Sequence, residues 1–277
     1  MKLIFDEISA ACSKKITQAY STSFTLGIRF LSKKFHNPIY NIYGLVRCAD
    51  EIVDSFHEYD KKYLLKKYKT DAFEAIEQKI SINPVLNSFQ ETANRYNIGL
   101  DLIHIFFESM EMDLEKKEFN RVAFDKYILG SAEVVGLMCL KVFINGDLKR
   151  YEELKPYAMK LGSAFQKINF LRDLGSDINN LGRYYFPQSE GNFTADQKKV
   201  IEKEIEAEFK IALEGIRMLP AGAKRGVYLA YSYYINLFRK IKKNSVEKVL
   251  SQRIRLPASK KIGLLFNCIL KEKLNHI

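Results

Sequence analysis

Apolar and polar residues alternate along this chain with the period of an α-helix almost throughout. Between residues 5 and 20 the apolar positions Ile8, Ala11, Cys12 and Ile16 lie mostly three or four apart, the spacing that lines one face of a helix. The same period predicts helices over residues 38–56, 61–79, 84–96, 100–112, 124–143, 151–179, 195–218, 221–243 and 259–274, with a shorter piece at 246–256. No useful stretch alternates as a strand does, so the pattern predicts an all-α chain.

Local signals place several boundaries between these helices. The hydroxyl-rich Ser21-Thr22-Ser23 predicts a turn and a new helix start, because Ser and Thr side chains cap helix N-termini. Asn37-Pro38 and Asn83-Pro84 are each expected to open a helix, since proline suits the first helical turn. The stretch from Ser189 to Ala195 is predicted to be a loop.

Two glycines, Gly130 and Gly136, interrupt one predicted helix. Glycine inside a helix costs roughly 1 kcal/mol relative to alanine. We therefore expect a ligand or another helix to approach the backbone closely there.

Composition limits the class of protein. With 277 residues, 47% of them hydrophobic, the chain is long enough to form a single domain over residues 1–277. The four cysteines are widely spaced without a C-x-x-C pair, which predicts neither a zinc site nor a disulfide framework and fits a reducing cytoplasm. No leader peptide and no apolar run of membrane-spanning length is evident, so we expect a cytoplasmic protein, soluble or peripherally membrane-associated.

The net charge of +11 favours an anionic partner, such as a diphosphate, an anionic membrane surface or nucleic acid. Its basic residues are dispersed, and no zinc-finger, RRM or basic-zipper pattern is present. Nucleic-acid binding is therefore not expected.

The first candidate site is Tyr43-Gly-Leu-Val-Arg47-Cys-Ala-Asp50-Glu51-Ile-Val-Asp54. Asp50 and Asp54 are four residues apart and share one helix face, with Arg47 and Tyr43 on the same stripe. Like charges at this spacing destabilise a helix unless water or a cation offsets them. Because the flanking residues are apolar, we favour a divalent cation such as Mg²⁺ over a solvated acidic stripe.

The second site repeats this arrangement. Gln166, Asn169, Asp173 and Asp177 follow one another at intervals of three, four and four residues along one face. One amide and two carboxylates form a second set of oxygen ligands. Arg47, Arg172 and Arg183 flank the two sites and could bind diphosphate oxygens or pair with the neighbouring acids.

With these motifs the chain resembles the squalene and phytoene synthase family. The family's first motif reads roughly Y-x-x-C-R-x-x-D-[DE]-x-x-D, and its second reads Q-x-x-N-I-L-R-D-x-x-x-D-x-x-x-G-R-x-Y-x-P. The second matches Gln166 to Asp177 and then Gly182-Arg183-Tyr184-Tyr185-Phe186-Pro187. The similarity extends from Tyr20-Ser21-Thr22-Ser23-Phe24 to Arg253-Ile-Arg255-Leu-Pro257 and so covers nearly the whole chain, most closely resembling bacterial phytoene synthases.

The resemblance implies the class I isoprenoid synthase fold, a helical bundle around a central cavity with the two aspartate faces opposed at its mouth. It implies a site of three parts. Metal ligands would be Asp50, Asp54, Asn169, Asp173 and Asp177. Diphosphate would be bound by Ser21, Ser23, Arg47, Gln166, Arg172 and Arg183, and Tyr43, Tyr127 and Tyr234 would line the reaction chamber as catalytic residues beside the four aspartates.

The activity implied is a prenyltransferase of isoprenoid and carotenoid biosynthesis, requiring Mg²⁺ with Mn²⁺ as the alternative ion. The first reading is condensation of two geranylgeranyl diphosphates to phytoene without NADPH. The alternative is a squalene or dehydrosqualene synthase using farnesyl diphosphate, and a further one is a non-catalytic assembly factor. Two departures from the family pattern are Glu133, in place of a small residue near the cavity, and Val46, in place of cysteine.

The expected partners are therefore prenyl diphosphate substrates. The apolar products and the charge of +11 also predict peripheral membrane contact. The sequence leaves the chain length of the substrate and the oligomeric state open.

Overall fold

Helices follow one another along nearly all of the chain, as expected. The structure is a computed structural model that describes residues 1–115, 118–187, 193–257, 259–260 and 263–264. In chain order its helices are α1 (Lys2–Tyr20), α2 (Thr22–Arg29), α3 (Lys33–Ser55), α4 (Lys61–Gln78), α5 (Pro84–Arg95), α6 (Leu100–Glu115), α7 (Arg121–Ile128), the π-helical turn η1 (Leu129–Glu133), α8 (Val134–Phe143), α9 (Leu148–Leu181), α10 (Ala195–Met218), α11 (Ala221–Lys242) and α12 (Val246–Ser251). Within the described ranges there is no strand, only an isolated bridge between Glu118 and Tyr184.

Side-chain caps begin several helices where the sequence predicted them. The Ser21 hydroxyl accepts a hydrogen bond from the Phe24 backbone N–H at 3.2 Å and so starts α2. The Asn83 side chain accepts from the Val85 backbone N–H at 3.0 Å, one residue after Pro84 opens α5. These bonds satisfy backbone donors that the first helical turn leaves free.

The prediction that α3 opens at Asn37-Pro38 is wrong. The helix begins at Lys33, and Pro38 lies inside it. The added turn buries the Phe35 ring, whose centroid lies 5.5 Å from that of Phe143 in an edge-to-face contact. We attribute the earlier start to this burial, which offsets the single backbone hydrogen bond that proline cannot make.

The single helix predicted over residues 124–143 is divided by a wider π-helical turn, η1. A Cβ atom on Gly130 would lie 2.6 Å from the Ile105 carbonyl oxygen of α6, and one on Gly136 would lie 3.1 Å from the Ala158 carbonyl oxygen of α9. Both glycines therefore allow a neighbouring helix to approach closely, as expected. Their role is packing between helices, and the wider turn inserts one extra residue at the tightest of these contacts.

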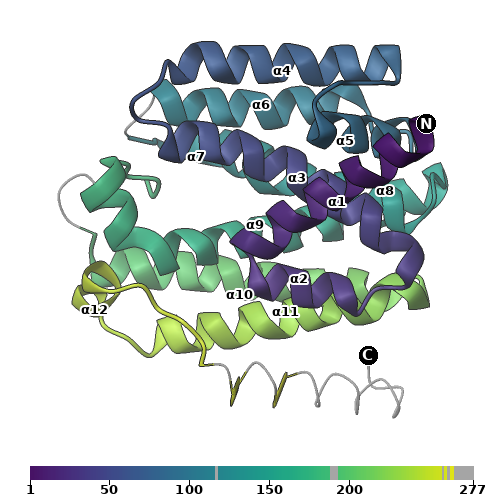
Figure 1. The fold of residues 1–277 in the computed structure, drawn as a ribbon. Coiled ribbons are helices and arrows are strands. Elements are labelled where there is room, and N and C mark those ends of the chain that lie inside the picture. Colours follow the sequence, from purple (N-terminus) through teal and green to yellow (C-terminus); the bar gives the residue numbers. More distant parts are fainter. Residues whose placement is uncertain (116–117, 188–192, 258, 261–262, 265–277) are drawn as a thin grey trace.

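The long helix α9 organises the second half of the molecule. It contacts α8, α10, α11 and α12, while α1 packs on α3 and α5 at the other side (Figure 1). Buried apolar residues form two clusters, one mainly from α3 to α8 and one mainly from α7 to α12, and Val227 of α11 packs against both. The predicted site residues on α3 and α9 lie between these two clusters.

Three predictions concern the ends and loops. The short helix predicted over residues 246–256 ends at Ser251. Most of the predicted helix 259–274 and residues 189–192 of the predicted loop lie outside the described residues. No helix in the described part of the chain is both long enough and apolar enough to cross a bilayer.

Gly130→Ala tests the helix contact at η1. We expect a loss of about 1–3 kcal/mol in the free energy of unfolding, because the added methyl group would meet a backbone oxygen that cannot move aside. Urea denaturation of this variant beside Gly27→Ala gives the comparison, since a Cβ on Gly27 would find its nearest atom at 3.6 Å, an ordinary contact. A Gly130→Ala variant as stable as the wild type would contradict the packing argument.

Candidate active site

The first acidic face lies at the C-terminal end of α3. Asp50 and Asp54 are half-buried, with 35% and 37% of their side chains exposed. Arg47 pairs with Glu51 and lies 3.8 Å from Asp50. Its guanidinium also lies 4.2 Å above the ring of Tyr20, at the end of α1. Arginine is thus present beside the acids, held by a carboxylate and by an aromatic face.

The second acidic face lies on α9. The Asn169 amide donates to Gln166 Oε1 at 3.2 Å and accepts from the Tyr234 hydroxyl at 3.1 Å. Asp173 accepts from Arg172 Nε at 3.0 Å. Arg253 Nε lies 2.7 Å from the same carboxylate. The spacing of three, four and four residues thus places these groups on one face, as the sequence predicted.

Arg183 joins the two faces. Its Nη1 lies 2.7 Å from Asp54 Oδ1, and its Nη2 donates to the Val53 carbonyl at 3.2 Å. Arg183 follows directly after Gly182, which ends α9 in a left-handed conformation with φ of 62°. The turn at Gly182 therefore brings an arginine from the end of α9 to the end of α3.

The carboxylates repel one another across this gap. Burial raises the pKa of Asp177 to about 8, and the carboxylates of Asp173 and Asp54 raise it further. Burial likewise raises the pKa of Asp50 to about 8, with Asp54 adding to the shift. Since Asp54 on α3 acts on Asp177 on α9, the two faces are opposed, as the resemblance implied.

These residues fit a hard divalent cation. They offer carboxylate and amide oxygens, the ligands Mg²⁺ prefers, and they carry negative charge that the neighbouring arginines do not fully compensate. In the described ranges no three His, Cys, Asp or Glu residues already converge as a metal site. Mg²⁺ commonly takes one or two carboxylates and completes its shell with water and substrate phosphate oxygens.

A cavity of about 290 Å³ extends inward from the acidic faces. Its outer end is lined by Val46, Gln166 and Asn169, and its inner end by Phe143 and Leu154. Asn169 and Leu154 are 15 residues apart on α9, which corresponds to roughly 22 Å along the helix. The hollow is thus long, narrow and mostly apolar.

Two of the three predicted tyrosines line this cavity. Tyr43 stacks on Phe24 with ring centroids 4.8 Å apart, and Tyr234 stacks on Phe165 at 3.9 Å. Burial raises the pKa of Tyr43 to about 12, which keeps its hydroxyl protonated at neutral pH. Both rings therefore present neutral aromatic faces to the hollow.

Tyr127, expected to line the chamber, is placed elsewhere. Its hydroxyl donates to Asp113 Oδ2 at 2.7 Å, and it does not contribute to the cavity wall. Tyr185 donates to Asp113 Oδ1 at 2.8 Å, and Arg183 Nη1 lies 3.7 Å from that oxygen. Sequence analysis missed Asp113, which is buried with 3% of its side chain exposed. Its signal was an acid at helical spacing on the apolar stripe of Phe106 and Met110.

The remaining predicted residues lie near the mouth or beside it. Ser21 caps α2, and Ser23 lies in the first turn of that helix. Val46 lines the cavity, whereas Glu133 does not. Burial raises the pKa of Glu133 to about 7, with Lys160 opposing the shift. Its carboxyl is therefore influenced by the charges of Lys160 on α9 and Glu208 on α10.

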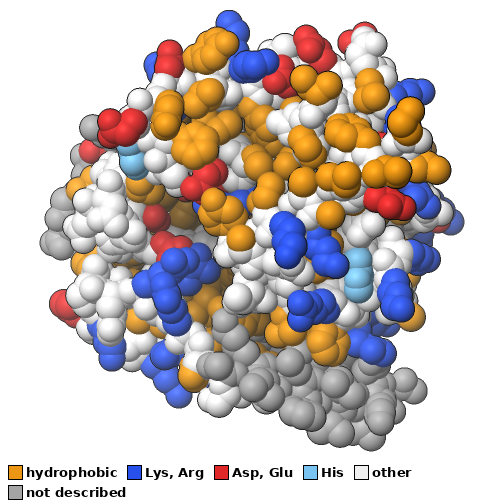
Figure 2. All heavy atoms as spheres, viewed as in Figure 1, with side chains coloured by type: hydrophobic (Ala, Val, Ile, Leu, Met, Phe, Trp, Pro, Cys, Tyr) orange, Lys and Arg blue, Asp and Glu red, His pale blue; other side chains and the backbone are white. Residues whose placement is uncertain are grey.

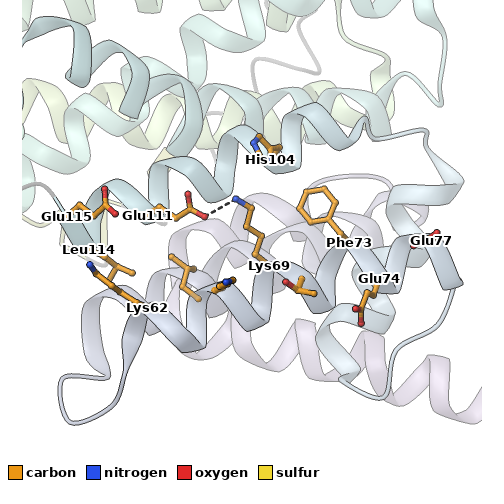
Figure 3. A pocket seen from close by; sticks show the side chains of 12 residues that line it. Lys62, Lys69, Phe73, Glu74, Glu77, His104, Glu111, Leu114 and Glu115 are labelled. Carbon is orange, nitrogen blue, oxygen red and sulfur yellow. Dashed lines mark hydrogen bonds and ion pairs between the residues drawn. The ribbon is translucent and has the colours of Figure 1, made fainter.

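A larger groove of about 670 Å³ lies between α4 and α6 (Figure 3). It contains none of the predicted site residues. Its α4 wall carries Lys62, Lys66 and Lys69 at one end and Glu74 and Glu77 at the other, and Lys69 pairs with Glu111 of α6 at 2.8 Å. Nothing in its lining matches the chemistry of the acidic faces.

Comparison with known proteins identifies the family to which this chain belongs. The model of the squalene/phytoene synthase family matches residues 17–260. The chain belongs to this family. A 4,4'-diapophytoene synthase of Staphylococcus haemolyticus is 29% identical over 64% of this chain and 62% of its own length. A phytoene synthase of Arthrospira platensis is 26% identical over 91% of this chain and 89% of its own length.

Solved structures agree in fold. A dehydrosqualene synthase superposes with a TM-score of 0.82 at 20% identity, covering 97% of this chain and 98% of the other. A squalene synthase from Alicyclobacillus acidocaldarius reaches 0.75 at 18% identity, covering 87% and 95%. The expected isoprenoid synthase fold is confirmed.

The raised pKa values predict how stability depends on pH. Aspartate titrates near 3.9 in an unfolded chain, whereas Asp50 and Asp177 titrate near 8 in the folded protein. The folded state therefore holds these protons more tightly, and the metal-free protein should lose stability as pH rises from about 4 through 8. Thermal unfolding in EDTA between pH 5 and 8.5 measures this loss, and added Mg²⁺ should reverse it at the alkaline end.

The double variant Asp50→Asn/Asp177→Asn is the control, because it removes both titrations and should flatten the profile. A metal-free wild type that becomes more stable with rising pH would contradict the arrangement of charges.

Asp113→Asn tests the group that holds Arg183. We expect the KM for prenyl diphosphate to rise about tenfold, because losing the charge weakens one of two anchors of Arg183, the arginine that the family resemblance assigns to diphosphate binding. Steady-state kinetics measures this, with the exposed Asp125→Asn as the matched control. Unchanged kinetics in a folded Asp113→Asn protein would show that Asp113 does not contribute to substrate binding.

Proposed function

We propose that this chain is a prenyltransferase that joins two geranylgeranyl diphosphates head to head to form phytoene, releasing diphosphate. The observation that carries the proposal is the pair of opposed acidic faces, joined by Arg183 through Asp54, at the mouth of a long apolar cavity. Diphosphate is the ligand that needs both metal-binding carboxylates and arginines, and a prenyl tail is what an apolar cavity accommodates.

Each group has a task in this reaction. Bound Mg²⁺ would neutralise the leaving diphosphate, and Asp50, Asp54, Asn169, Asp173 and Asp177 would hold it. Arg47, Arg172 and Arg183 would bind the diphosphate oxygens, with Ser21, Ser23 and Gln166 beside them. Arg47 Nε is buried without a hydrogen-bond partner among the described residues, so it can donate to a ligand at no cost in existing bonds.

The cavity meets the remaining requirement of the reaction, which is the exclusion of water. An allylic cation formed when diphosphate leaves must be kept from water until the second prenyl chain attacks it. The faces of Tyr43 and Tyr234 attract such a cation electrostatically while excluding solvent. Loss of a proton would then give a cyclopropyl diphosphate. Its ionisation would release the second diphosphate, and rearrangement with loss of a second proton would complete the product without NADPH.

A second candidate is condensation of two farnesyl diphosphates, as in squalene or dehydrosqualene synthases. It is favoured by the bulk at the inner end of the cavity, where Phe143, Leu154 and Tyr157 close the hollow. The proposal that the substrate is geranylgeranyl diphosphate relies on the length of the cavity along α9 and on the phytoene synthases among the relatives. That residues 1–277 act as a single domain stays a prediction, as does peripheral membrane contact.

Incubation with Mg²⁺ and either prenyl diphosphate, with and without NADPH, tests the proposal through the extracted hydrocarbons. Phytoene from geranylgeranyl diphosphate without NADPH is the expected result. Asp54→Asn should lower kcat at least about a hundredfold, because it removes both a metal ligand and the partner of Arg183. Squalene or dehydrosqualene from farnesyl diphosphate would select the second candidate, and no turnover of either substrate would contradict both.

A further inference from the structure

The first helix, α1, buries hydroxyl side chains and exposes large apolar ones. It buries Ser9, Ser13 and Thr17, while Leu3, Ile4 and Ile8 are 78%, 61% and 53% exposed. A helix on the surface of a globular protein normally does the reverse and buries its apolar stripe. The outer side of α1 therefore exposes three large apolar side chains that no described residue covers, with Glu7 between them and Lys14 and Lys15 on the following turns.

The buried side of α1 explains how this orientation is fixed. The Ser13 and Ser88 hydroxyls are 2.7 Å apart, and the Asn87 amide donates to Asp6 at 3.0 Å and to Ser9 at 3.2 Å. A Cβ on Gly44 would lie 2.6 Å from Ser13 Oγ, so α3 approaches the small hydroxyl face closely. Specific polar contacts thus hold the apolar residues outward.

A basic groove adjoins this face. It has a volume of about 420 Å³ and is lined by Ala10 of α1 together with residues of α3 and α5, including Lys33, Lys34 and Arg95. These three cations form no ion pair with an acid within the described ranges, and Glu91 is the one carboxylate in the lining. Figure 2 shows hydrophobic side chains gathered over the upper and central part of this side of the molecule, with Lys and Arg below them.

We propose that the outer face of α1 and the adjoining groove, named here the α1 face, dock on an anionic phospholipid surface. An exposed apolar helix stripe with lysines beside it has the pattern of a helix that lies in the plane of a membrane interface. Leu3, Ile4 and Ile8 enter the acyl boundary, while Lys33, Lys34 and Arg95 meet lipid phosphates. The proposal specifies the membrane contact proposed above by naming its surface.

Charge distinguishes a lipid from a second copy of this chain. In a two-fold symmetric dimer built on this face, the same patch meets itself, so the basic groove would approach its own copy. Such like-charge contacts oppose association, whereas anionic lipid headgroups complement the groove.

Sedimentation of the full chain with vesicles tests the proposal. We expect binding to phosphatidylcholine vesicles containing phosphatidylglycerol at roughly 0.15 M salt. Ile4→Ser/Ile8→Ser should weaken this binding about tenfold by removing apolar burial. Lys33→Gln/Lys34→Gln should weaken it roughly tenfold on anionic vesicles only.

Matched controls lie elsewhere on the surface. Val122→Ser/Val200→Ser removes two exposed apolar side chains, and Lys203→Gln/Lys210→Gln removes two exposed charges. Both should bind vesicles as the wild type does. Absence of wild-type binding, or equal losses in the controls, would overturn the proposal, and so would an Ile4→Ser/Ile8→Ser variant that changes molecular mass in solution while vesicle binding stays the same.

Turnover of detergent-dispersed prenyl diphosphate separates this proposal from the enzymatic one. The Ile4→Ser/Ile8→Ser variant should keep wild-type turnover in detergent while losing vesicle binding. Vesicle binding by a wild type that turns over neither substrate would contradict the enzymatic function and leave the α1 face supported.

Discussion

Negative charge at the mouth of a dry cavity is the constraint on which the rest of this structure depends. Asp50 and Asp54 on α3 face Asp177 on α9, and burial, followed by repulsion between these carboxylates, raises the pKa of Asp50 and Asp177 to about 8. Here Arg183 holds Asp54 from the end of α9, and Asp113 holds Arg183 from α6. The site is thereby kept open to a cationic ligand, whose binding would displace the protons that Asp50 and Asp177 hold at neutral pH.

The helical scaffold turns this arrangement into a chamber. α3 and α9 carry the acids at one end and wall the cavity along their length, so a diphosphate at the mouth would direct its tail inward. The close contact at Gly130 brings η1 against α6, and the one at Gly136 brings α8 against α9. Outside the cavity wall, a buried cluster is formed by Asp113, Tyr127 and Tyr185. This cluster positions the guanidinium of Arg183 at the mouth.

The sequence predicted the features that depend on local spacing. It did not predict the features that depend on contacts between residues far apart in the chain. The period of the apolar residues predicted the helices, and the spacing of Asp50 with Asp54 and of Asp173 with Asp177 predicted two acidic faces. That these faces oppose each other came from the family resemblance, since spacing within one helix says nothing about another. The early start of α3 depends on the contact of Phe35 with Phe143. The placement of Tyr127 and the role of Asp113 depend on three segments that meet only in the fold, and the inverted α1 depends on hydroxyl contacts with α5.

The central claim is that opposed carboxylates and a diphosphate share the same cations. Calorimetric titration with a non-reactive thiodiphosphate analogue of the prenyl substrate, with and without Mg²⁺, tests this directly through the reciprocity of the two affinities. The account predicts tight analogue binding only with Mg²⁺, tighter Mg²⁺ binding with the analogue present, and loss of this coupling in Asp54→Asn and Asp177→Asn. Analogue binding of equal affinity with and without Mg²⁺ would contradict it.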